Sequence, residues 1–221
     1  MQELELIFDP ETWEIVGLSF RVSLIATAIA AVLSIPLGLS IAAREFRGKR
    51  QLVTLMNTLL SLPTVAVGLL VYYLLSRSGP LGELELLFSP VAIIIGQVIL
   101  SLPVITALTH GAVAGVDPRV RATALTLGAG RYRADLAVLA ESRTGILAAV
   151  AAGFGRVISE VGSAIMVGGN IRGVTRTITT AIALETSKGE FGRSAVLAVV
   201  LLAVALGANI LVHRLLVRRS G

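Results

Sequence analysis

Long apolar segments constrain this chain more than any other feature of its sequence. They run over 16–43, 52–75, 87–114, 145–167 and 194–217, and each is long enough to cross the ~30 Å hydrocarbon core of a bilayer. Only helices and closed barrels satisfy every backbone group in lipid. Because the apolar residues are consecutive rather than alternating, they favour helices. The sequence therefore predicts an all-α integral membrane protein with five transmembrane helices, in agreement with its mean hydropathy of +0.86.

The charged residues between these segments predict an orientation. Loops on the cytoplasmic side of a membrane protein carry an excess of Lys and Arg. An odd number of spans puts the two termini on opposite sides, and the excess of basic residues then places the N-terminal segment, 1–15, outside and the tail, 218–221, inside. The high isoelectric point thus reflects topology and indicates no nucleic-acid partner. The side predicted to be cytoplasmic holds these basic residues: Arg44, Arg47, Lys49, Arg50, Arg119, Arg121, Arg131, Arg133, Arg143, Arg214, Arg218 and Arg219.

A polar segment at 117–140 lies between the third and fourth spans. Asp117 and Pro118 are typical of a helix start, Gly128 to Gly130 predict a turn, and 132–140 forms a second amphipathic stretch. Such a cytoplasmic helix-turn-helix suits docking of a soluble partner. The alternative is a basic interfacial helix held by anionic lipid.

The fourth span contains two opposite charges, Arg156 and Glu160. A spacing of four places them on one helix face, where they are expected to pair. Charges inside a span are costly and usually face a partner or a water path. The pair is either structural or changes partner during gating.

The segment over 168–191 is rich in Gly, Arg and Thr and is predicted to lie on the outer face. Backbone N–H groups, guanidinium groups and hydroxyls are donors that suit an oxyanion. The alternative is a turn and a short re-entrant helix over 175–186 that closes the outer mouth. The residues predicted to form an outer gate or to guide an anion are Gly168, Gly169, Asn170, Arg172, Thr175, Arg176 and Thr177.

Prolines inside two of the apolar segments predict helix kinks. Pro63 and Pro103 each follow Leu-Ser-Leu, and proline removes a backbone hydrogen bond. These kinks shape a pore or hinge, or are simply tolerated. Neither a phosphate-binding loop nor a metal-ligand cluster occurs in the sequence, so we predict no catalytic site, no metal site and no ATP hydrolysis by this chain.

The 117–140 segment resembles the cytoplasmic signature loop of permease subunits in type I ATP-binding-cassette (ABC) importers. The usual form is Glu-Ala-Ala, three residues, Gly, nine residues and Ile-x-Leu-Pro. Aligned on the glycine, the chain keeps the small residues and the spacing, but it lacks the Glu and the final Pro. The residues that this resemblance assigns to ATPase coupling are Ala122, Thr123, Ala124, Leu127, Gly128 and Ala129.

The stretch over 160–191 resembles the oxyanion branch of these permeases, tungstate permeases above all, then molybdate and sulfate permeases. The likeness extends over 16–217. It implies a homodimer in the prokaryotic plasma (inner) membrane, in contact with lipid. The implied partners are two cytoplasmic ABC ATPase subunits, which bind ATP and Mg, and an extracytoplasmic oxyanion-binding protein. This chain itself is expected to hold no cofactor, and transport is expected to proceed by alternating access.

Two other classes of function remain as alternatives. One is an anion channel or carrier that needs no ATPase, although only the fourth span carries both acidic and basic groups and the chain shows no convincing inverted repeat. The other is a membrane-anchored interaction protein, a function that does not explain the proline-containing spans or the Gly-rich outer segment.

Overall fold

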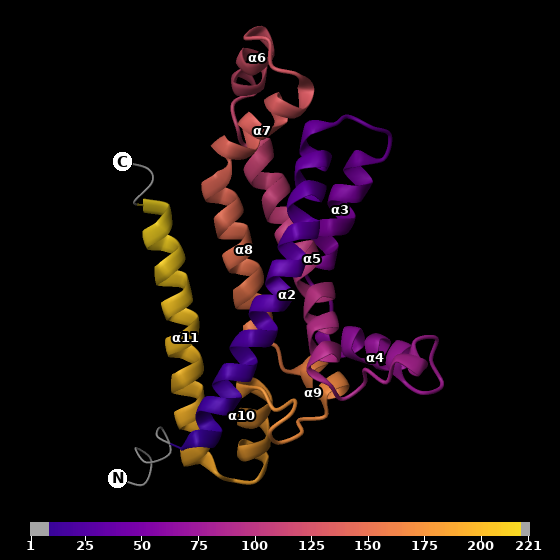
Figure 1. Cartoon of the computed structure of the whole chain (residues 1–221), viewed down its shortest axis with the longest axis vertical. Helices are drawn as coiled ribbons and strands as arrows, with labels where there is room; N and C mark the ends of the chain where they lie inside the picture. Colours follow the sequence, from indigo (N-terminus) through magenta and orange to yellow (C-terminus); the bar gives the residue numbers. More distant parts are fainter. Residues whose placement is uncertain (1–8, 218–221) are drawn as a thin grey trace.

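The computed structural model describes residues 9–217, and the described chain consists of helices and connecting loops without a strand. Three long helices, α2 (Pro10–Ala43), α5 (Pro90–Ala114) and α11 (Phe191–Val217), extend between the two ends of the molecule (Figure 1). The predicted tail, 218–221, and residues 1–8 lie outside this part. The shorter elements are α3 (Lys49–Leu59), α4 (Thr64–Leu75), the 3₁₀ turn η1 (Gly82–Leu84), α6 (Pro118–Thr126), α7 (Arg131–Glu141), α8 (Arg143–Ile158), α9 (Gly162–Gly168) and α10 (Ile178–Ser187).

The first helix begins earlier than the first predicted span. Asp9 accepts a hydrogen bond from the backbone N–H of Glu11 at 3.1 Å, and Pro10 occupies the first turn. This combination starts a helix because the Asp side chain satisfies a free N–H and proline has none to satisfy. Residues 9–15 of the predicted N-terminal segment therefore belong to the cap and first turns of α2.

The packing of α2 against α5 forms the centre of the molecule. A Cβ atom at Gly38 would lie 2.9 Å from Thr109 Cβ, so glycine allows the two helices to approach closely. Ser34 Oγ donates to the carbonyl oxygen of Leu102 at 3.0 Å across the same contact. The main apolar cluster joins these two helices to α4 and α9 and includes Val22, Val67, Val71, Ile93, Leu100 and Val167.

The single helix expected over 52–75 is two helices. α3 and α4 meet at an angle of 98°, and Pro63 is the N-cap of α4 in an extended conformation. A proline has no N–H for the preceding turn and keeps the residue before it away from the helical region, which explains a break at this place. By contrast, α5 continues unbroken through Pro103.

The helix expected over 145–167 is also interrupted. α8 ends at Ile158 and α9 begins at Gly162, so Ser159, Glu160 and Val161 connect two shorter helices. By length and hydropathy, three helices (α2, α5 and α11) can each cross a membrane within the described residues. The count rises to five if the bent pairs α3–α4 and α7–α8, the latter bent by 67°, are each one span.

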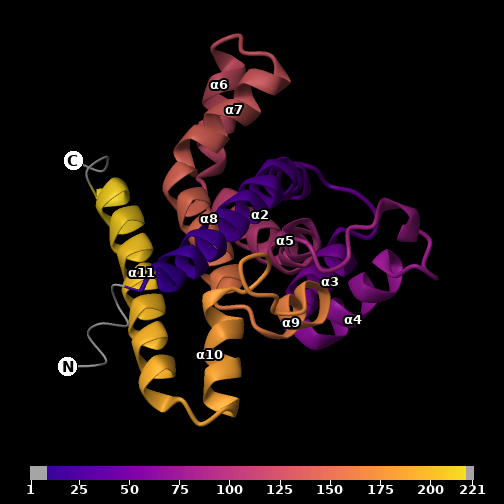
Figure 2. The same ribbon diagram turned by 60° about the horizontal axis from the view of Figure 1, so that its bottom comes forward.

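The two ends of the molecule differ in the elements they carry (Figure 1). One end, called the α6 end below, holds α6, α7 and the connection from α2 to α3, so the basic segments over 44–50 and 119–133 lie at the same end. The other, called the α10 end, holds the start of α2 together with α9 and α10. Figure 2 shows α10 and α11 at this end as a hairpin of two helices.

Candidate functional site

The predicted coupling residues lie at the tip of the α6 end (Figure 1). Ala122, Thr123 and Ala124 are on α6, and the chain then turns through Leu127 to Ala129 into α7. The helix start predicted at Asp117 is confirmed, because this side chain accepts a hydrogen bond from the N–H of Arg119 at 2.9 Å. Gly128 has a φ of +84°, a conformation that glycine adopts without strain.

Side-chain contacts hold this tip in a defined shape. Arg121 Nε donates to Asp135 Oδ1 at 3.0 Å and thereby ties α6 to α7. Ala134 and Val138 are buried and anchor α7 to the body of the protein. Leu127 and Tyr132 are 83% and 75% exposed. The tip thus presents apolar side chains on a supported projection, which is a suitable form for entering a groove on another protein.

A charge pair with a buried carboxylate joins the end of α8 to the break between α8 and α9. Arg156 Nη1 lies 2.9 Å from Glu160 Oε2, and the Glu160 side chain is only 2% exposed. The ion pair expected from the sequence is therefore present, although Glu160 lies beyond the end of α8. Whether the pair takes part in gating stays a prediction.

Glu160 connects three helices. Its Oε1 accepts a hydrogen bond from the N–H of Ser163 at 3.1 Å, in the first turn of α9. Its backbone carbonyl accepts one from Thr179 Oγ1 of α10 at 2.7 Å. The guanidinium of Arg156 in α8 and the N–H of Ser163 compensate for the desolvation of the carboxylate. The structure thus reveals a helix-capping contact that the i, i+4 spacing did not predict.

The amide of Gln97 lies beside this break and was not singled out from the sequence. Gln97 Nε2 donates to the carbonyl oxygen of Val157, at the end of α8, at 3.1 Å. Gln97 Oε1 is buried and finds no hydrogen-bond partner in the part of the chain that the structure describes. An unsatisfied acceptor of this kind costs about 1–3 kcal/mol. The available signal was that Gln97 is the only amide side chain in the third apolar segment, 87–114.

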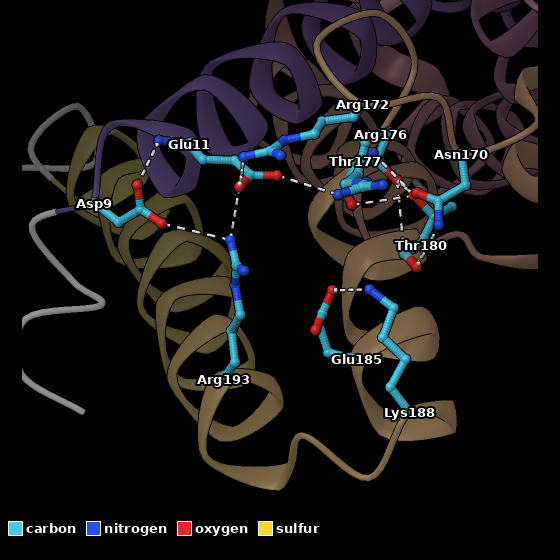
Figure 3. Close-up of polar contacts among 10 residues, drawn as sticks. All are labelled: Asp9, Glu11, Asn170, Arg172, Arg176, Thr177, Thr180, Glu185, Lys188 and Arg193. Carbon is cyan, nitrogen blue, oxygen red and sulfur yellow. Dashed lines mark hydrogen bonds and ion pairs between the residues drawn. The ribbon is translucent and has the colours of Figure 1, made fainter. Parts of the chain in front are cut away.

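At the α10 end, a cluster of arginines surrounds one carboxylate (Figure 3). Glu11 lies 2.6 Å from Arg172, 3.1 Å from Arg176 and 2.9 Å from Arg193, measured from guanidinium nitrogen to carboxylate oxygen. Arg193 also lies 3.4 Å from Asp9. The cluster joins the start of α2, the loop over 169–177 and the start of α11.

Only part of this cluster was predicted. Arg172 and Arg176 were singled out as neighbours in a Gly-rich segment, whereas Asp9, Glu11 and Arg193 were not. The available signal was that charged residues flank the first and last apolar segments at the ends predicted to lie outside. Their pairing depends on the fold, because Glu11 and Arg193 are 182 residues apart.

The hydroxyls predicted to offer donors to an oxyanion bond within the protein. Thr175 Oγ1 donates to the carbonyl oxygen of Gly168 and accepts from the N–H of Ile171. Thr177 caps α10 in a reciprocal arrangement with Thr180, and Thr180 Oγ1 donates to Asn170 Oδ1 at 2.9 Å. These residues shape the 169–177 loop. Because their hydroxyls already bond within the protein, the arginine side chains of this loop are the groups that remain available to bind an anion.

Close packing also fixes the start of this loop. Gly169 has a φ of +69°, and a Cβ atom there would lie 2.8 Å from the Phe88 ring. Glycine is required on both counts, because another residue would be strained and would clash. Gly168 packs in a similar way against Ile93. The residues predicted for the outer gate thus lie together at the α10 end, while the coupling residues lie at the opposite end.

Comparison with known proteins places this architecture in a family. Residues 34–220 match the family described as "Binding-protein-dependent transport system inner membrane component". The chain is 42% identical over 212 residues to the "Probable anion ABC transporter permease protein" of Haloferax volcanii, covering 94% of this chain and 91% of that protein. It is 40% identical over 213 residues to the "Tungstate uptake system permease protein TupB" of Peptoclostridium acidaminophilum, covering 96% and 93%.

A solved structure has a similar fold. The bacterial ABC transporter described as involved in the import of the acidic polysaccharide alginate aligns with a TM-score of 0.76 at 19% identity, covering 97% of this chain and 83% of that one. At this identity the likeness concerns the fold alone, whereas the relatives above concern the family. The chain therefore belongs to the binding-protein-dependent transport system inner membrane components, the permease subunits of ABC importers, in the branch that includes tungstate and molybdenum permeases.

Proposed function

We propose that this chain is the membrane-spanning subunit of an ATP-driven importer whose cargo is tungstate. The observation that carries the proposal is the 40% identity to a tungstate uptake permease along 93% of that protein's length. Arg172, Arg176 and Arg193 support it, because these three cations gather around Glu11 at the end opposite the coupling tip. Molybdate and sulfate, which share the tetrahedral oxyanion chemistry, are the alternative cargoes.

In the proposed complex, two copies of this chain form the path through the plasma membrane. Two cytoplasmic ATPase subunits, which bind ATP and Mg, receive the α6–α7 tips. An extracytoplasmic binding protein delivers the anion at the α10 end. ATP binding moves the tips, and the two ends of the path open in alternation. This chain contributes the path and the coupling surface, and ATP hydrolysis is the work of the partner.

Reconstitution tests this function. The chain is assembled in nanodiscs with its candidate ATPase and binding protein, and ATP hydrolysis is measured with tungstate, molybdate or sulfate. We expect strong stimulation only by the tungstate-loaded binding protein. A greater response to molybdate or sulfate would reassign the cargo. Anion flux through this chain in liposomes without ATPase would contradict the proposal and favour a channel or carrier.

A matched pair of glycine variants tests the coupling tip. Gly128 and Gly189 have φ values of +84° and +83°, and a Cβ atom added at either position would meet nothing within 4 Å. Gly128→Asp and Gly189→Asp therefore impose similar strain at opposite ends of the protein. We expect Gly128→Asp to lose stimulated ATP hydrolysis and uptake while inserting normally, and Gly189→Asp to keep ATPase binding. Equal ATPase binding and coupling by both variants would remove the docking assignment.

A further inference from the structure

A cavity of about 370 Å³ lies beside the arginine cluster at the α10 end. The first three turns of α2 form one wall, and Gly173 and Arg176 of the 169–177 loop contribute to the other. The volume is many times the ~30 Å³ that one water occupies in the liquid, so a hydrated tetrahedral anion fits. Its charged lining residues are Glu11, Glu14, Arg21 and Arg176.

Arg21 is the cation in this cavity that pairs with no described side chain. Its side chain is exposed, and it forms no hydrogen bond or ion pair among the side chains that the structure describes. It lies about three turns inside α2, a helix whose most apolar 18-residue window has a mean hydropathy of 2.2. Unpaired charges in apolar spans are costly and usually face a water-filled cavity or a ligand, which is where Arg21 is found.

The second cation, Arg176, has unused hydrogen-bonding capacity. Its Nη1 donates to Glu11 at 3.1 Å, but its Nε is buried without a partner among the residues that the structure describes. Glu11 serves three guanidinium groups at once. Each guanidinium has five N–H donors, so a single carboxylate cannot satisfy them. A tetrahedral oxyanion has four acceptor oxygens and matches these donors better.

From these observations we propose that the cavity is an entry site for a tetrahedral oxyanion, bound by Arg21 and Arg176, in which Glu11 is a resident carboxylate that the anion displaces from Arg176. The inference rests on the proposed function and names a site for its cargo. Glu14 also lines the cavity and has no ion pair among the described side chains. Its negative charge weakens anion binding, which suits a site that must pass its ligand onward.

Two substitutions separate displacement from simple charge removal. Glu11→Gln and Glu14→Gln each remove one negative charge from the same cavity, but only Glu11 engages arginines. Equilibrium binding of sodium tungstate is measured on the permease–ATPase complex in nanodiscs without the binding protein. We expect the tungstate affinity of Glu11→Gln to be roughly tenfold higher than that of Glu14→Gln, because only the Glu11 substitution releases arginine N–H donors from an ion pair. Equal effects would overturn the displacement.

Arg21 provides the second readout. Arg21→Gln breaks no contact of the described protein, so the variant is expected to fold and assemble, and it should weaken tungstate binding roughly tenfold. Arg21→Lys should retain most of the affinity. Unchanged binding in Arg21→Gln would overturn the site. If the wild type imports tungstate while these variants fail to differ, the site is wrong and the proposed function stands; if the wild type imports no oxyanion, the proposed function itself fails.

Discussion

The surroundings of Glu160 restrict its replacement. Glu160 is a nearly fully buried carboxylate that pairs with Arg156, and it also accepts a hydrogen bond from the first turn of α9. Removing one member of a buried pair leaves an uncompensated charge, which costs more than removing both. The contribution of each residue therefore depends on the presence of the other.

A double-mutant cycle measures this dependence. We expect Arg156→Met to destabilise the protein by about 1–3 kcal/mol, because Glu160 loses its charged partner. In Arg156→Met/Glu160→Gln the neutral amide still accepts from Ser163, so the double variant should be more stable than the sum of the single effects predicts. The expected coupling is about 0.5–3 kcal/mol, measured by unfolding in mixed detergent micelles.

The control for this cycle is Ser159→Ala. Ser159 lies next to the pair but is exposed, and its hydroxyl bonds only to carbonyls of its own helix. This variant should show little coupling with Arg156→Met. Additive effects of the Arg156 and Glu160 substitutions would show that the pair contributes nothing specific.

Prediction at the residue scale succeeded where the relevant contact is local. The spacing of Arg156 and Glu160 was enough to predict their pairing, because both lie within about one helical turn. The cluster around Glu11 was missed because its members come from three distant parts of the chain. No pattern in sequence indicates that residues 182 apart will meet.

At the scale of elements, α4 and α9 approach closely where α4 carries Gly68. A Cβ atom at Gly68 would lie 2.8 Å from the backbone Cα of Ser163. We expect Gly68→Ala to destabilise the protein by about 1–3 kcal/mol, because the backbone of α9 cannot move aside without disturbing its packing. The thermal stability of the purified protein provides the measurement.

Gly111→Ala is the matched substitution for comparison. Gly111 also lies within a helix, but an added Cβ there meets nothing within 4 Å. Its substitution should be neutral or stabilise by up to about 1 kcal/mol through helix propensity. If both variants lose stability equally, close approach of α4 and α9 is not the cause.

The elements that were predicted well carry their own boundary signals. Asp117 and Pro118 start α6, and Gly128 to Gly130 separate it from α7, as expected. Pro63 was predicted to kink the second apolar segment, and the structure has a full break there. The break in the fourth segment was not predicted, because hydropathy is continuous across it. The interruption at Glu160 is stabilised by the backbone N–H of Ser163 in α9 and the hydroxyl of Thr179 in α10, and thus depends on tertiary structure.

For the whole molecule, orientation is the prediction on which the coupling and entry sites both depend. The chain contains no cysteine, so single cysteines can be introduced without removing any others. Leu127→Cys lies at the α6 end and Ser187→Cys at the α10 end, and both positions are exposed. In intact cells, a membrane-impermeant maleimide should label Ser187→Cys readily and Leu127→Cys only after permeabilisation.

Labelling of both cysteines from the same side would contradict the prediction that an odd number of spans separates Leu127 from Ser187. The opposite pattern would invert the molecule and would move the arginine cluster to the cytoplasmic face. Detergent-solubilised protein, in which both cysteines should react, controls for differences in accessibility.

The pairing of α2 with α5 also has a consequence for biogenesis. During synthesis, the segment between these helices takes on the order of several seconds to emerge from the ribosome at ~5–20 residues per second. In the meantime α2 can remain in lipid, because Ser19 and Thr27 donate to carbonyls of their own helix at 2.8 and 2.7 Å. Ser34 instead donates to Leu102 of α5. We therefore expect the nascent first helix to persist without its partner, and Ser34 to gain its interhelical acceptor only when α5 enters the membrane.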